Sequence, residues 1–218
     1  MIFQLEKDDI WFPQPDLAEE DGLLAVGGDL SVNRLLLAYQ YGIFPWYAFR
    51  HNDILWYCPK ERFVIFPEEI HISHSMKKLI KSKKYGITMN RDFNSVIHNC
   101  SKLRIDNECA WLGEDMVKAY IELHKLGCAA SVEIWDSENN LVGGLYGVTV
   151  GCCFVGESMF SLVPNASKLA LIYLATRLKE FDGAFIDCQF ETPHLKSMGG
   201  RFIGYTEYLN LINYKKED

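Results

Sequence analysis

Two polar signatures interrupt stretches of this chain that are otherwise typical of buried strands. The first, residues 156–161, has the sequence GESMFS and closes an apolar, glycine-rich run that begins at Leu141. The second, residues 186–189, has the sequence IDCQ and lies between two phenylalanines. Because residues two apart on a strand share a face, we expect Asp187 and Gln189 to point one way and their apolar neighbours the other.

A carboxylate and a carboxamide held side by side at the edge of an apolar core are costly to bury unless they are paired. This cost favours a functional site, in which Asp187 accepts a proton or holds its neighbour and Gln189 orients a nucleophile. The alternative is a half-exposed strand whose polar face meets water.

The composition is that of an ordinary globular protein. Of the 218 residues, 49% are hydrophobic and 23% charged, which is enough apolar surface for one large domain or two modest ones. The net charge of -7 argues against a globally basic nucleic-acid binder and leaves room for a local basic patch. The seven cysteines form no Cys-x-x-Cys pair, so we expect reduced thiols in a cytoplasmic protein rather than disulfides or a zinc site.

No targeting or membrane segment is expected. The first residues, MIFQLE, lack the charged start and apolar core of a signal peptide. The most apolar span, residues 141–160, contains five glycines and Glu157, and its β-branched residues favour a hairpin over a membrane helix.

The elements around the two signatures indicate an α+β protein of two domains. Residues 1–60 are aromatic and rich in turns, with a short helix that Ser31 caps and Gly42 ends, and we interpret them as a small N-terminal domain. Residues 61–218 form the second domain. Helices are expected at residues 73–82, 91–100, 114–126 and 165–180, the last capped by Asn165. Strands are expected at residues 62–66, 130–135, 141–148, 151–156 and 184–190.

This order of elements is typical of an N-acyltransferase core with a mixed sheet, of the GNAT-like type that uses acetyl-coenzyme A. Such enzymes cradle a pyrophosphate on backbone N–H groups between a strand and a helix N-terminus, which requires glycines there. The corresponding connection here, residues 161–165, has no glycine, and Pro164 lacks an N–H donor. The sequence therefore predicts the frame without the coenzyme A cradle.

A basic stretch suggests where an acyl donor binds instead. Residues 71–84 contain five lysines and two histidines and no acidic residue. On an acidic protein such a cluster is a candidate footprint for a nucleic-acid backbone, with Lys77, Lys78, Lys83 and Lys84 as the tRNA-binding candidates. The alternative is an ordinary solvated helix face.

Several long strings resemble the bacterial leucyl/phenylalanyl-tRNA–protein transferase family, in the same order from about Phe12 to Leu211. They are residues 21–30 (DGLLAVGGDL), 39–46 (YQYGIFPW), 143–148 (GGLYGV), 156–161 (GESMFS), 165–168 (NASK) and 186–189 (IDCQ).

The resemblance implies the transfer of Leu, Phe or Met from aminoacyl-tRNA to the N-terminal Arg or Lys of a protein, which marks that protein for N-degron-dependent degradation. It implies a monomeric cytoplasmic enzyme that uses no cofactor and no metal. The family's catalytic pair falls on Asp187 and Gln189. Its contacts to the aminoacyl-adenosine fall on Tyr39, Trp46, Trp111, Tyr120, Leu145, Phe154, Glu157, Ser161, Leu171 and Leu174. The family often has an aromatic residue where this chain has Leu174, which leaves the ranking of Phe and Leu open.

Two other functions compete with this one. A coenzyme A-dependent N-acetyltransferase would explain the frame but not the glycine-free connection. A non-catalytic tRNA or RNA-binding module would explain the lysines but not the pairing of Asp187 with Gln189. Whether Asp187 acts as a base or only orients Gln189 is left open by the sequence.

Overall fold

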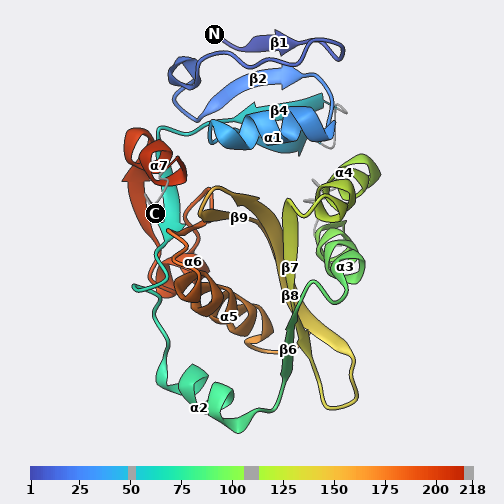
Figure 1. Ribbon diagram of the computed structural model, residues 1–218, viewed down its shortest axis with the longest axis vertical. Coiled ribbons are helices and arrows are strands. Elements are labelled where there is room, and N and C mark those ends of the chain that lie inside the picture. The colour runs from blue at the N-terminus through green and yellow to red at the C-terminus, as the bar shows by residue number, and fades with distance from the viewer. Residues whose placement is uncertain (49–52, 106–112, 214–218) are drawn as a thin grey trace.

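A small sheet forms the N-terminal part of the molecule. The computed structural model describes residues 1–48, 53–105 and 113–213. The small sheet has the strand order β1-β2-β4-β3, formed by β1 (Phe3–Leu5), β2 (Leu23–Gly27), β4 (Asp53–Tyr57) and β3 (Phe44–Ala48). A short 3-10 helix, η1 (Pro15–Leu17), precedes β2, and helix α1 (Val32–Gln40) lies against the sheet on the side that faces the rest of the molecule, as Figure 1 shows.

Helix α1 begins and ends as its sequence dictates. The Ser31 hydroxyl accepts a hydrogen bond from the backbone N–H of Arg34 at 3.4 Å, which satisfies one of the free donors of the first turn. Gly42 then adopts a φ of +68° beyond the helix end. Its position also requires glycine because a Cβ atom would lie 2.6 Å from the Tyr208 ring.

A larger, mixed sheet of seven strands forms the body of the molecule, in the order β11-β5-β10-β9-β8-β7-β6. Its strands are β5 (Glu61–Ile65), β6 (Gly86–Met89), β7 (Ala129–Trp135), β8 (Leu141–Val150), β9 (Cys153–Ser161), β10 (Ile186–Asp187) and β11 (Arg201–Gly204). The chain passes from the small sheet to the large one within residues 58–60.

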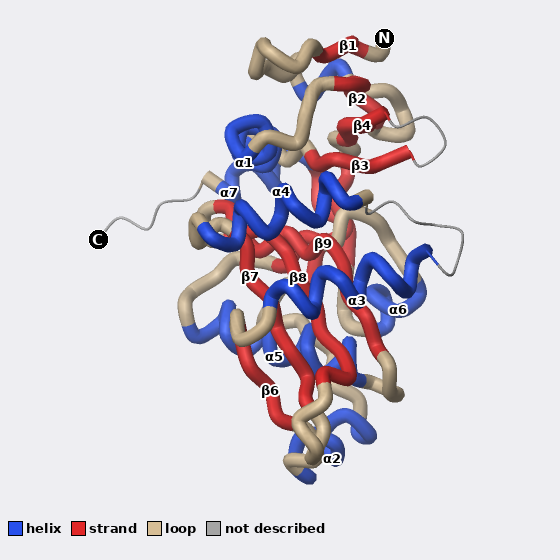
Figure 2. The backbone as a smooth tube through the Cα atoms, turned by 90° about the vertical axis from the view of Figure 1, so that its right-hand side faces the viewer, coloured by secondary structure: helices blue, strands red, loops and turns tan. Residues whose placement is uncertain are grey.

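Helices cover both faces of the larger sheet. Helices α3 (Phe93–Ile105) and α4 (Glu114–Lys125) lie on one face and α5 (Ala166–Glu180) on the other (Figures 1 and 2). Helix α2 (His74–Ser82) lies at the end of the molecule farthest from the small sheet (Figure 1). Helices α6 (Pro193–Ser197) and α7 (Tyr205–Ile212) flank β11 in the chain.

Strands β9 and β10 are parallel neighbours that stay together only briefly. Their register pairs Ile186 with Phe154 and Asp187 with Val155, after which β10 ends. Strand β9 continues alongside β8 as far as Ser161. The edge of β9 beyond Val155 therefore loses its partner, and an opening forms in the sheet at this point.

The predicted α+β architecture, a small N-terminal sheet followed by a larger mixed sheet, is confirmed. The helices expected at residues 73–82, 114–126 and 165–180 are present to within one residue at each end. No helix in the described part of the chain is long and apolar enough to cross a membrane.

Two strand predictions were wrong in extent. The strand expected at 151–156 runs from Cys153 to Ser161, so the polar signature lies inside it. The strand expected at 184–190 is only Ile186–Asp187, because the chain turns immediately afterwards. Asn165 precedes α5 as expected but makes no side-chain cap. Its φ is +70°, and the Ser161 hydroxyl accepts from the N–H of Ser167 instead, at 3.0 Å.

Candidate active site

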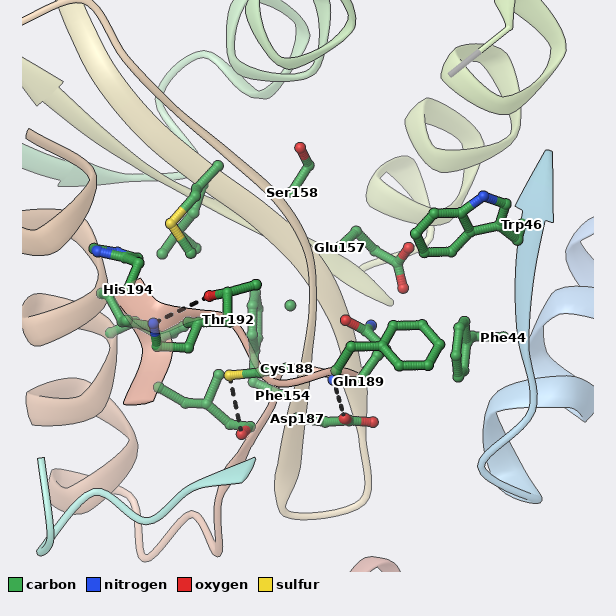
Figure 3. Close-up of a pocket in the computed structure, with 18 of the residues that line it drawn as sticks. Phe44, Trp46, Phe154, Glu157, Ser158, Asp187, Cys188, Gln189, Thr192 and His194 are labelled. Atoms are coloured by element: carbon green, nitrogen blue, oxygen red, sulfur yellow. Dashed lines mark hydrogen bonds between the residues drawn. The ribbon is translucent and has the colours of Figure 1, made fainter. Parts of the chain in front are cut away.

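A cavity of about 290 Å³ opens where β9 and β10 separate. Its wall is apolar and comes from three strands and one helix; Figure 3 shows side chains that line it. The apolar side chains are Leu145 of β8, Phe154 and Met159 of β9, Leu171 and Leu174 of α5, and Ile186 of β10. A cavity of this kind fits an apolar amino-acid side chain.

The small sheet supplies the remaining side of the cavity. Phe44 and Trp46 of β3 lie beside Phe190, with ring centroids 5.7 and 5.8 Å from the Phe190 ring. Trp46 and Phe190 are 36% and 38% exposed, so part of each of these two rings is open to solvent. Exposed aromatic rings can stack on a base or a ribose.

Asp187 is enclosed by its partners. It borders the cavity but is 0% exposed, and both carboxylate oxygens are bonded. Oδ1 accepts from the backbone N–H of Gln189 at 2.9 Å (Figure 3), and Oδ2 accepts from the Tyr208 hydroxyl at 2.8 Å. The Arg62 Nε atom lies 3.5 Å from Oδ2 and supplies the opposite charge. The carboxylate thus holds the Gln189 backbone in place.

The geometry corrects the expectation that Asp187 and Gln189 share one face of a strand. Gln189 has a φ of +59°, in the left-handed region, and the N–H of Phe190 bonds back to the Cys188 carbonyl at 2.7 Å. An Asp side chain that bonds the N–H two residues on is an Asx turn, which replaces the strand. The pair is still brought together, and the Gln189 side chain borders the cavity.

Glu157 is held by tyrosines from two different helices. Tyr39 of α1 donates to Oε1 at 2.6 Å and Tyr120 of α4 donates to Oε2 at 2.9 Å. The two hydroxyl oxygens are 2.5 Å apart. Burial and the Glu157 charge raise the pKa of both tyrosines well above the usual value, which keeps them as donors. Glu157 borders the cavity on the same side as Gln189 and Trp46 in Figure 3.

The other predicted site residues do not all lie at the cavity. Tyr39 and Tyr120 reach the site only through Glu157. Ser161 is not among the cavity-lining residues, because its hydroxyl bonds the start of α5. Trp111 lies outside the described residues. The exposed lysines lie on helix α2 or directly after it, away from the cavity: Lys77, Lys78, Lys83 and Lys84.

Thiol and metal chemistry have little support among the described residues. Six cysteines there are free, and Cys109 lies outside the described ranges. Cys188 borders the cavity, and burial together with the charge of Asp187 raises the pKa of its thiol, which leaves it a weak nucleophile. No cluster of metal-ligating side chains occurs in the part of the chain that the structure describes.

Sequence reasoning missed several residues of the site. Arg62 and Tyr208 contact Asp187 from β5 and α7, which are distant in the chain. Phe44 and Phe190 form the rim, and Thr192 and His194 line the far side of the cavity (Figure 3). Two signals were available: Phe44 stands within one of the recognised strings, and Arg62 is a lone cation in an apolar strand.

An apolar pocket between two diverging parallel strands, closed by the small sheet and bordered by the Gln189 carboxamide, defines an acyltransferase-like protein. Residues 64–213 match the profile of the leucyl/phenylalanyl-tRNA protein transferase family, and residues 28–60 match its N-terminal domain. The chain belongs to this family.

Curated relatives agree over nearly the whole length. The leucyl/phenylalanyl-tRNA–protein transferase of Syntrophus aciditrophicus (strain SB) is 52% identical over 204 residues, which cover 93% of this chain and 84% of that one. The enzyme of the same name from Flavobacterium johnsoniae is 46% identical over 95% of this chain and 97% of its own. Among solved structures, L-PGS from Bacillus licheniformis has a TM-score of 0.45 at 11% identity, covering 78% of this chain and 54% of that one.

Proposed function

We propose that this protein transfers Leu, Phe or Met from aminoacyl-tRNA to the N-terminal Arg or Lys of acceptor proteins, forming a peptide bond. The products carry an N-terminal residue that directs them to N-degron-dependent degradation in the cytoplasm. The observation that carries the proposal is the apolar cavity beside Gln189, in a chain that belongs to this transferase family.

The donor's side chain occupies the apolar cavity, and its adenosine lies against the aromatic rim. Pocket discrimination by one methyl group is worth roughly 1–3 kcal/mol, so Val and Ile donors are transferred more slowly than Leu. Glu157 contacts the donor's α-amino group, and the lysines of α2 bind the tRNA backbone without reading its sequence.

The chemical step needs positioning more than activation. An aminoacyl ester is already activated, so a neutral amine must only be placed against its carbonyl carbon. A protein α-amino group has a pKa of about 7.7–8.0, which leaves a substantial neutral fraction at neutral pH. The Gln189 carboxamide oxygen orients that amine.

Asp187 acts as the support of Gln189 rather than as the base. Both of its oxygens are already bonded, to Gln189, Tyr208 and Arg62, and its side chain is closed to solvent. The proton leaves the amine through solvent or the leaving ribose hydroxyl instead.

The start of α5 disfavours coenzyme A as the donor. Two N–H groups at the start of α5, where a pyrophosphate would bind, are bonded internally: Ser167 donates to the Ser161 hydroxyl and Ala166 to the Val163 carbonyl. An anion there would have to break these bonds.

The test is transfer of labelled Phe from Phe-tRNA to a peptide that begins with Arg, compared with one that begins with Ala. The proposal predicts labelled product from the Arg peptide alone, and no heat of binding with acetyl-coenzyme A in calorimetry. Binding of tRNA without product would favour a binding module, and acetylation of the peptide would favour an acetyltransferase. Equal rates from Val-tRNA and Leu-tRNA would contradict the cavity's assignment.

A further inference from the structure

One buried cation joins the two halves of the active site. Arg62 of β5 is 2% exposed, and its guanidinium lies between the turn that carries Gln189 and the wall supplied by the small sheet. Its side chain is not among those that line the cavity. Arg62 can therefore act on the reaction only through the residues that it contacts.

Towards the larger sheet, Arg62 faces Asp187. Its Nε atom lies 3.5 Å from Oδ2, the oxygen that also accepts from Tyr208. The other oxygen, Oδ1, holds the N–H of Gln189. The charge of Arg62 therefore acts on Gln189 through a single carboxylate. Burial, the largest influence, lowers the pKa of the Arg62 guanidinium, but Asp187 together with Tyr208 and Cys58 raises it by more, so that the pKa is raised overall.

Towards the small sheet, the same guanidinium contacts the backbone and one ring of the rim. Its Nη2 atom donates to the carbonyl of Gly42, and its Cζ atom lies 4.8 Å from the centre of the Phe44 ring. Phe44 in turn packs edge-on against Phe190, which directly follows Gln189. The two contacts thus fix the aromatic rim relative to the turn that carries Gln189.

We propose that Arg62 is a positioning residue for aminoacyl transfer, which sets Gln189 and the aromatic rim in one fixed geometry. This inference rests on the proposed function. A lysine cannot replace it, because the planar guanidinium pairs with Asp187 through Nε and donates to the Gly42 carbonyl through Nη2, while its flat faces pack on Phe44 and Tyr208. A small misplacement of positioning groups costs about 100-fold in rate.

The experiment compares kcat and KM for Phe-tRNA, with a peptide beginning with Arg, in the full-length wild type and three variants: Arg62→Ala, Arg62→Lys and Arg201→Ala. Arg201 is the matched control, because it also pairs with a carboxylate, Glu69, and packs on a ring, Phe66, but touches neither Asp187 nor the rim. Circular dichroism gives the folded fraction, to which every kcat is referred. Millimolar guanidinium chloride is then added to refill the space left in Arg62→Ala.

We expect Arg62→Ala to lower kcat by about 100-fold, with KM for Phe-tRNA nearly unchanged because the lysines of α2 and the apolar cavity are intact. Guanidinium should restore a large part of the kcat of Arg62→Ala but none of that of Arg62→Lys, in which the space is filled. Arg201→Ala should match the wild type.

An unchanged kcat in folded Arg62→Ala, or a loss that guanidinium does not reverse, would overturn the inference. If Arg62→Ala does not fold, Arg62→Lys decides, since a wild-type kcat in that variant removes any need for the planar group. Failure of the wild type to transfer Phe contradicts the proposed function itself, whereas an active wild type with an unaffected Arg62 variant contradicts only the role of Arg62.

Discussion

Shortening Leu174 to alanine should shift the donor preference from Leu towards Phe. Leu174 lies on α5, is 2% exposed and forms part of the apolar wall of the cavity. The change removes about three carbon atoms, each worth ~0.8 kcal/mol when buried. A Leu donor therefore loses up to ~2.4 kcal/mol of contact, which is about 60-fold in kcat/KM. A Phe donor has the extra volume to occupy part of the new space, so the Phe to Leu ratio should rise by about tenfold or more.

The assay is competitive transfer from equal amounts of Phe-tRNA and Leu-tRNA to one peptide that begins with Arg. The product ratio depends only on kcat/KM for the two donors, so a partly unfolded sample does not distort it. This matters because a buried Leu→Ala change costs about 2–5 kcal/mol of stability.

Leu169→Ala is the matched control. Leu169 lies on the same helix and is buried in the same core, but it does not line the cavity. The control should lose similar stability and keep the wild-type product ratio. An unchanged ratio in Leu174→Ala, or an equal shift in both variants, would refute the placement of the donor side chain.

Three further predictions concern the tRNA surface, the carboxylate at the cavity and one histidine. Replacing Lys77 and Lys78 by Ala should raise the KM for aminoacyl-tRNA and flatten its log–log salt dependence by about 0.7–0.9 per lost phosphate contact. The rate of transfer from an aminoacyl-adenosine analogue should be unchanged. An equal loss of rate with the analogue would show that these lysines have a structural role. Tyr120→Phe removes a donor to the Glu157 carboxylate and should lower the free energy of unfolding, measured in urea, by about 1.5–3 kcal/mol. Tyr205→Phe should lower it less, because the Tyr205 hydroxyl donates to a neutral carbonyl. Equal losses in the two variants would argue against a charged acceptor. Burial and nearby Lys168 lower the pKa of His194 below 6.5. The neutral form of His194 therefore stabilises the folded state above pH 6.5, and this stabilisation is lost as the pH falls below 6.5. The Tm of the wild type should therefore drop more than that of His194→Gln between pH 7.5 and about 5.5, and parallel curves would contradict the lowered pKa.

The sequence was most informative where a pattern is local. Helix α2 begins where Ser73 accepts from the N–H of Met76, and α3 begins where Asp92 accepts from the N–H of Ser95. The Ser73 cap can be read from residue type and spacing alone, whereas for α3 the sequence offers Asn90 as well as Asp92. The apolar wall residues Leu171 and Leu174 were also predicted, through the family resemblance, and both line the cavity.

Prediction failed where one side chain changed the course of the backbone. Apolar alternation from residue 184 to 190 favours a strand, but the Asp187 carboxylate bonds the N–H of Gln189 and turns the chain. Local side-chain bonds of this kind compete with sheet pairing. The residues that stabilise the carboxylate, Arg62 and Tyr208, come from distant parts of the sequence, and no spacing rule connects them to residue 187.

The position of β5 in the larger sheet also determines when an active molecule can exist. Strand β5 is made early, but both of its neighbours, β10 and β11, are made late. The roughly 120 residues between Ile65 and its partner Ile186 take on the order of 6–24 s to synthesise at about 5–20 residues per second. During that time an apolar strand leaves the ribosome with both edges unpaired, which is a template for aggregation. The yield of active enzyme in a cell therefore depends on what covers strand β5 until β10 and β11 have been synthesised.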